Sequence, residues 1–114
     1  MNATLVAFSP LGRSLLTDKP HSFAKAQSLN LLKENPRFLE PNLSYNIKLT
    51  NKFRKLASSY NMSAAELALS WLLNKDDAII PIPGTRSSDH LKGMVKAAYN
   101  KLSSKEVNEI ETIL

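Results

Sequence analysis

The chain has 114 residues, of which 43% are hydrophobic and 22% are charged, a balance typical of a folded globular protein of at most one domain. The absence of cysteine excludes disulfides and thiolate metal sites, and no apolar run approaches the roughly 18–20 residues that a membrane helix needs. The net charge of +5 makes nucleic acid a partner to consider.

The first residues lack both a basic segment and an apolar core, so we expect no signal peptide. A chain without cysteine fits a reducing compartment, and we expect a cytoplasmic protein, with the nucleus as the second choice. The two histidines, His21 and His90, lie far apart and have no ligand-like spacing, so we expect no metal site.

An apolar run over residues 5–9 predicts the first strand. The run shows no polar alternation, so we expect both faces of the strand to be covered. A long connection over residues 10–42 follows, and within it we predict a short helix over residues 23–32. Connections of this length are usually functional rather than idle.

The next apolar spacing predicts a helix over residues 43–60. Three lysines on one face of this helix, Lys48, Lys52 and Lys55, fit either a nucleic-acid patch or a solvated surface. No zinc finger, RNA-binding aromatic pair or helix-turn-helix signal accompanies them. We therefore favour the solvated surface and expect no nucleic-acid partner and no membrane.

Two capping boxes mark later helix starts. The pattern Ser63-Ala64-Ala65-Glu66 predicts a helix over residues 63–74, and Ser103-Ser104-Lys105-Glu106 predicts another over residues 104–113. Between them we predict a second apolar strand over residues 78–82, ended by prolines, and a helix over residues 88–100.

Strands that alternate with helices predict parallel pairing and an α/β fold. Two strands alone cannot make a stable parallel sheet, so the architecture needs more strands than the chain supplies. The (β/α)8 barrel places a phosphate site at the loops after its last two strands, and it typically takes about 250 residues. We therefore predict a C-terminal fragment of a TIM barrel, consisting of the last two strands and the helices that follow them.

Four segments carry a family resemblance: Phe8-Ser9-Pro10-Leu11-Gly12-Arg13, Pro36-Arg37-Phe38, residues 63–72 and residues 80–86. In this order and spacing they resemble the C-terminal part of the aldo-keto reductases, and within that family the fungal pyridoxal reductase group. The resemblance implies a partial aldo-keto reductase domain over residues 1–114. It also implies a family activity, the NADPH-dependent reduction of an aldehyde or ketone, with pyridoxal as the substrate of that group.

The resemblance also implies a site for NADP(H) in two loops. The loop after the first strand would lie along the pyrophosphate, where amides and an arginine can approach phosphate oxygens. The loop after the second strand would hold the adenosine 2′-phosphate, which a guanidinium fork recognises. The implied cofactor-binding residues are Ser9, Pro10, Leu11, Gly12, Arg13, Lys19, Gly84, Thr85, Arg86, Ser87 and His90. Taken alone, each loop also fits an ordinary strand-ending turn or a serine N-cap.

Two departures from the family pattern stand out. Relatives commonly place a Glu-Asn pair where this chain has Gly93 and Met94, which puts hydrogen bonding to the adenine in doubt. The family's catalytic aspartate, tyrosine, lysine and histidine lie on earlier strands and loops that are outside this sequence. The tyrosines present, Tyr45, Tyr60 and Tyr99, fall on predicted helices or their edges and are interpreted as packing residues, so no catalytic residue is assigned.

Three hypotheses for function remain open. The chain is a truncated product of a reductase gene that is inactive alone, or a fragment that completes a barrel with a complementary chain. The third possibility is a non-catalytic dinucleotide-binding or regulatory module.

Overall fold

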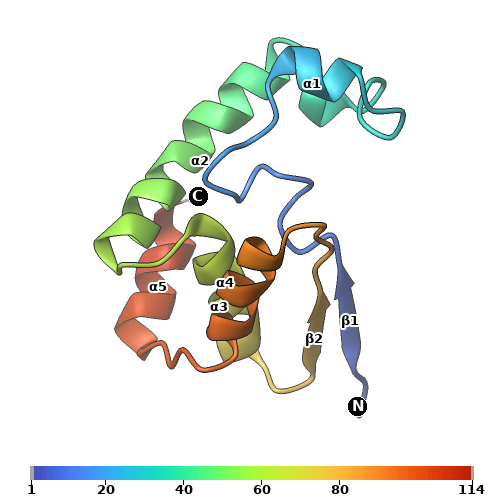
Figure 1. Ribbon diagram of the computed structural model, residues 1–114. Coiled ribbons are helices and arrows are strands. Elements are labelled where there is room, and N and C mark those ends of the chain that lie inside the picture. Colours follow the sequence, from blue (N-terminus) through green and yellow to red (C-terminus); the bar gives the residue numbers. More distant parts are fainter. Residues whose placement is uncertain (1, 114) are drawn as a thin grey trace.

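A two-stranded parallel sheet forms one edge of the molecule (Figure 1). The computed structural model describes residues 2–113. Strand β1 (Leu5–Phe8) pairs with β2 (Ile79–Ile82), with Leu5 opposite Ile79 and Phe8 opposite Ile82. Both strands therefore end at the same edge of the sheet, and the connections that follow them lie beside each other.

One face of this sheet is not covered by the described residues. Val6, Phe8, Ile80 and Ile82 share that face because paired positions in a parallel register project to the same side. Their exposed fractions are 53%, 73%, 52% and 52%. The expectation that both faces of the first strand are covered is therefore wrong for these residues, because the helices of this chain pack against one side only.

Helix α3 (Ala64–Lys75) is the centre of the molecule and contacts β2, α2, α4 and α5. Its start follows the capping pattern, since the Ser63 hydroxyl accepts a hydrogen bond of 3.0 Å from the Glu66 amide. The core around it is a cluster of buried apolar residues, namely Phe53, Ala57, Ala64, Leu67, Ala68 and Ile110. This core joins α3 to α2 (Asn42–Ser59) and α5 (Ser104–Ile113).

Helix α4 (Ser88–Ala97) lies against α3 and ends three residues before the limit predicted from the sequence, residue 100. The reason is Asn100, whose side-chain amide donates to Glu66 Oε1 at 3.0 Å and to Ser70 Oγ at 2.9 Å. Its carbonyl accepts from Asn74 Nδ2 at 2.9 Å. These bonds to α3 turn the chain away from the helix axis.

The long connection contains a second core. Leu15, Ala26, Leu32, Phe38 and Leu43 form a buried cluster that orders the connection against the start of α2. Helix α1 (Phe23–Gln27) is five residues shorter than predicted, since the chain turns at Ser28 and buries Leu32 from a loop. A short 3-10 helix, η1 (Pro36–Phe38), was not predicted.

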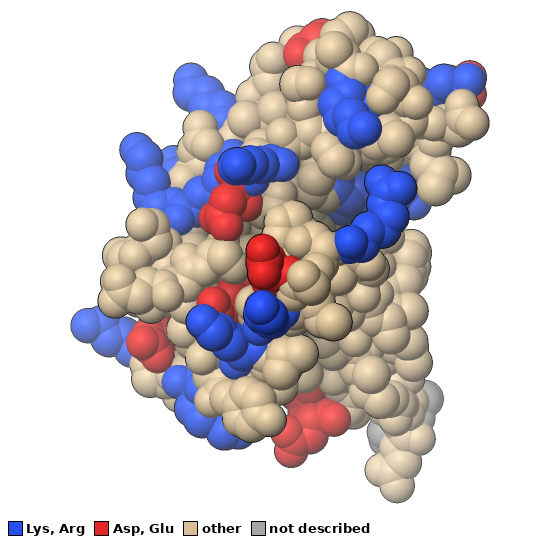
Figure 2. All heavy atoms as spheres, viewed as in Figure 1, with Lys and Arg blue, Asp and Glu red and all other residues tan. Residues whose placement is uncertain are grey.

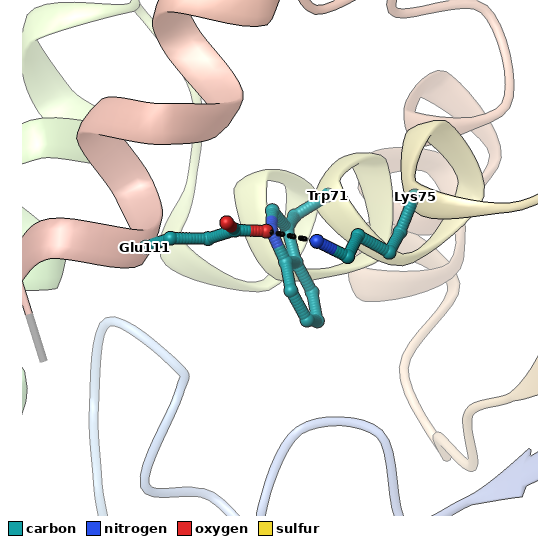
Figure 3. A network of polar contacts seen from close by, with 3 residues as sticks. All are labelled: Trp71, Lys75 and Glu111. Carbon is teal, nitrogen blue, oxygen red and sulfur yellow. Dashed lines mark hydrogen bonds and ion pairs between the residues drawn. The ribbon is translucent and has the colours of Figure 1, made fainter.

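Polar side chains fasten α5 to its neighbours. Figure 3 shows Glu111 of α5 reaching Trp71 and Lys75 of α3, with Lys75 Nζ at 2.6 Å and Trp71 Nε1 at 3.2 Å from Glu111 Oε1. The Lys75 and Trp71 hydrogen bonds lower the pKa of Glu111. On the α2 side, the Tyr60 hydroxyl donates to Glu109, and desolvation together with this bond raises the pKa of Tyr60 to about 12.

The exterior of α2 is basic, since Lys48, Lys52 and Lys55 are all exposed. Lys and Arg side chains on the face shown in Figure 2 are interspersed with acidic and neutral ones. Within residues 2–113, no helix combines the length and apolar character needed to span a membrane.

Candidate functional site

A cavity of about 860 Å³ opens beside the carboxyl ends of both strands. It is bordered by the two strand-to-helix connections, the first turn of α3 and one side of α4. Most of the residues singled out in the sequence line it, namely Ser9, Pro10, Leu11, Arg13, Lys19, Gly84, Thr85 and His90. Gly12, Arg86 and Ser87 belong to the same connections but lie outside its lining.

The first connection turns tightly through unusual backbone conformations. Gly12 has a φ of 58°, and three non-glycine residues, Ser9, Arg13 and Ser14, have φ values of 45°, 53° and 88°. Positive φ at such residues costs of order 1–3 kcal/mol each and persists only where the surroundings enforce it. Here the Gly12 amide donates to the Ser9 carbonyl at 3.0 Å and Leu15 is buried, so the turn is held from within and from the core.

The second connection is open by contrast. A Cβ at Gly84 would meet nothing within 4 Å, so a ligand can approach this backbone closely. The Ser87 hydroxyl caps α4 by accepting from the His90 amide at 3.3 Å, and Thr85 Oγ1 accepts from the Ser87 amide at 3.1 Å. Arg86 between them is exposed.

Cationic side chains outnumber acidic ones by one in the lining of the cavity. Its lining carries four cationic side chains, Arg13, Lys19, Lys92 and Lys96. Of the acidic residues in the lining, Asp18 accepts from the Ala64 amide at 3.0 Å and Glu66 accepts from Asn100 at 3.0 Å. The third, Asp89, lies 3.6 Å from Lys92. The first turn of α3 also borders the cavity, and its amino-terminal amides are already bonded, the Ala64 amide to Asp18 and the Glu66 amide to the Ser63 hydroxyl.

Several lining residues were not predicted from the sequence as contributors to a site. Asp18, His21, Lys92 and Lys96 come from loops and helix faces without any motif. Partial burial lowers the pKa of His21, and nearby Lys25 lowers it further, so its imidazole is neutral at pH 7. A signal for Lys92 and Lys96 existed in their i, i+4 spacing, which places them on the same side of α4.

The line of α4 that borders the cavity includes Gly93 and Met94, the positions at which the sequence departs from the family pattern. They present no hydrogen-bonding side chain, so this part of the wall offers shape and apolar contact.

None of the three tyrosines lines the cavity. Tyr45 and Tyr99 are 65% and 81% exposed, and Tyr60 is bonded to Glu109. Within residues 2–113, no group of three or more His, Cys, Asp or Glu side chains could hold a metal ion.

Known proteins are similar to this chain over nearly its whole length. The family model described as "Aldo/keto reductase family" matches residues 1–114. The chain is 36% identical over 109 residues to "Aldo-keto reductase yakc [NADP(+)]" of Schizosaccharomyces pombe, covering 96% of this chain and 32% of that protein. It is 34% identical over 106 residues to "Probable aldo-keto reductase 1" of Glycine max, covering 93% of this chain and 30% of that one.

A solved structure gives the same match in three dimensions. The glycerol dehydrogenase AKR11B4 from Gluconobacter oxydans superposes with a TM-score of 0.74 at 27% identity, over 99% of this chain and 34% of that one. The chain thus spans about a third of the length of these relatives.

Proposed function

Because the chain belongs to the aldo/keto reductase family, we propose that its cavity binds the phosphate-bearing part of NADP(H) and thereby serves the reduction of an aldehyde or ketone. The α/β fold, as part of an aldo-keto reductase barrel, was expected from the sequence and is confirmed. The single observation that supports the proposal most is the convergence of both strand-ending connections on one cation-lined cavity.

The donor set suits a dinucleotide phosphate. Arg13 and Lys19 on one wall can form charge-assisted hydrogen bonds to the pyrophosphate, and the backbone around Ser9 and Gly12 allows close approach. On the other side, Thr85 and Arg86 precede α4, whose amino-terminal dipole favours the 2′-phosphate. NADP(H), when bound, supplies the hydride for the reduction.

We further propose that these 114 residues alone do not reduce a carbonyl. Carbonyl reduction needs a general acid positioned to protonate the oxygen as hydride arrives. A tyrosine is the family's usual acid, and each tyrosine here is placed elsewhere: Tyr45 and Tyr99 are exposed and Tyr60 is engaged with Glu109. The chain would then contribute cofactor binding rather than proton transfer.

The substrate and compartment belong to the same proposal. The motifs resemble the fungal pyridoxal reductase group, so we propose pyridoxal as the carbonyl substrate of the whole barrel. A cytoplasmic location is proposed because the sequence has no cysteine that an oxidising compartment would pair.

The uncovered sheet face favours one alternative, in which a complementary barrel fragment completes the fold. Val6, Phe8, Ile80 and Ile82 present apolar surface that strands of a barrel would bury. A second, apolar cavity of about 480 Å³ adjoins β1 between α3 and α5, lined in part by Trp71, Leu72 and Ile110. Both surfaces would be protected in a complex with the remaining strands of a relative, and unchanged exposure after mixing would contradict this alternative.

A titration of the purified chain with NADPH and NADH tests the main proposal. We expect saturable amide shifts by nuclear magnetic resonance at Arg13, Thr85 and His90 with NADPH, weaker ones with NADH, and none at the remote Tyr45. No response at millimolar NADPH would overturn the proposal. Carbonyl-dependent oxidation of NADPH by the purified chain would overturn the separate proposal that it is inactive alone.

A further inference from the structure

Arg54 of α2 uses every N–H group of its guanidinium. Nη1 donates to the Leu15 carbonyl at 3.0 Å and to the Thr17 carbonyl at 3.3 Å. Nη2 donates to the Ile47 carbonyl at 2.7 Å and to Asn51 Oδ1 at 2.8 Å, and Nε donates to the same Asn51 oxygen at 3.1 Å. An arginine has five such donors in a rigid fork, and all of them are satisfied here.

Holding the Arg54 side chain in this position costs desolvation of its charge. Partial burial lowers the pKa of Arg54, and the charge of Asp18 opposes this effect. The group nevertheless stays charged at neutral pH, because no protein environment deprotonates a guanidinium. Arg54 is partly desolvated and bonds mainly to neutral carbonyls. We therefore interpret these bonds as holding the segments that carry the carbonyls, in addition to compensating for lost solvation of the charge.

Two of the carbonyls that Arg54 binds, those of Leu15 and Thr17, belong to the first connection, and Thr17 itself lines the cavity. Arg13 and Ser14 line the cavity just before Leu15, and Asp18 and Lys19 line it just after Thr17. Asp18 in turn accepts from the Ala64 amide at the start of α3. The segment over residues 15–18 is therefore tied to α2 at one point and to α3 at another.

We propose that Arg54 is a positioning residue for cofactor binding: it locks residues 13–19 in the conformation that presents Arg13 and Lys19 to the pyrophosphate. This inference rests on the proposed function. A lysine cannot replace Arg54, because a single ammonium group cannot bond carbonyls on two segments and Asn51 in the geometry of the fork. Arg54 itself lies outside the cavity lining, so its effect on binding would act through the residues that it holds.

The test compares two ligands, one with and one without the pyrophosphate that residues 13–19 are proposed to bind. We would measure dissociation constants of NADPH and of adenosine 2′-phosphate, which lacks the pyrophosphate, by amide shift titration for the full chain and for Arg54→Lys. We expect NADPH to bind about 10-fold more weakly in the variant, because an unlocked loop must be ordered on binding. Adenosine 2′-phosphate should bind within about twofold of the parent chain, because it does not require this wall. Arg37→Lys, at an exposed position with no side-chain hydrogen bond within residues 2–113, should change neither value.

An unchanged NADPH affinity in Arg54→Lys would overturn the inference, and so would equal losses for both ligands in a folded variant, which would indicate a general structural role. If Arg54→Lys does not fold, the exposed Asn51→Ala decides. This variant removes the acceptor that orients the fork, and it should weaken the binding of NADPH about threefold while leaving the binding of adenosine 2′-phosphate unchanged. If Asn51→Ala shows no selective loss of NADPH affinity, the inference is overturned. A parent chain that binds neither NADPH nor NADH overturns the proposed function itself, and the inference with it.

Discussion

The two connections that border the cavity differ in how firmly the rest of the chain holds them. Residues 9–21 turn through positive φ values, bury Leu15 and are tied to α2 and α3 by Arg54 and Asp18. Residues 83–87 are mostly exposed and, among the described contacts, bond only locally through Thr85 and Ser87. One wall is preorganised and the other is free to adjust, and we infer that they recognise different parts of the ligand.

The largest expected effect comes from removing the buried support of the preorganised wall. Leu15→Ala should destabilise the chain by about 2–5 kcal/mol, the usual cost of truncating a buried leucine. Leu15 is 8% exposed and packs with Phe38 and Leu43. Urea unfolding followed by circular dichroism would measure the loss.

Leu31, which is 79% exposed in the same connection, provides the matched control. Leu31→Ala should stay within about 0.5 kcal/mol of the parent chain. Equal effects of the two substitutions would show that the first connection has no core of its own, and the contrast between the two walls would fail.

The next effect separates the ligand groups that the two walls bind. Arg86→Ala should weaken NADPH by about 10- to 100-fold, the range for losing charge-assisted hydrogen bonds to one phosphate, and leave NADH unchanged. Arg13→Ala should weaken both dinucleotides alike, because the pyrophosphate is common to them. Calorimetric titration of both variants with both ligands gives four dissociation constants to compare with those of the parent chain. A loss of NADH affinity in Arg86→Ala would contradict the assignment of the 2′-phosphate to the second connection.

Substitution of Gly93 tests whether the α4 wall needs its glycine. A Cβ at this position would meet only Ser63 Oγ, at 4.0 Å, which is an ordinary contact. Gly93→Ala should therefore stabilise the chain by about 0.5–1 kcal/mol through helix propensity alone. Thermal unfolding measures the gain. A loss of stability would mean that the packing of α3 against α4 leaves no room for a methyl group.

Local chemistry made much of this fold predictable. The capping box at Ser103 forms both reciprocal bonds with Glu106. At Ser63, among the described contacts, only the bond from the Glu66 amide to the Ser63 hydroxyl forms, and the Glu66 carboxylate accepts from Asn100 instead. The apolar strands pair in parallel, as α/β alternation predicts. The early end of α4 could not be predicted, because it depends on Asn100 meeting Glu66 and Ser70, which are distant in the sequence.

The cavity likewise has features that the sequence predicts and features that it does not. The loops around Ser9 and Gly84 carry recognisable motifs, so their approach to one site was predictable. Arg54 is different: it belonged to a run of basic residues, and its role depends on the carbonyls of Leu15 and Thr17, which are 39 and 37 residues away. The cofactor roles of the individual residues stay predictions until a ligand is measured.

The smallest expected effect is a pH dependence contributed by His21, which lines the cavity on the preorganised side. Burial and Lys25 lower its pKa, so the free protein holds a neutral imidazole at pH 7. A phosphate nearby favours the charged form and raises that pKa, so binding takes up a proton at His21, and the contribution of His21 to the affinity for NADP⁺ should rise as pH falls from about 8 to about 6. His21→Gln retains the titration of the ligand's own 2′-phosphate and should lack this contribution, so the ratio of the two proteins' affinities should change with pH. Identical pH profiles for the two proteins would place His21 away from the bound phosphates and leave Arg13 and Lys19 as the cationic side chains of this wall that could reach them.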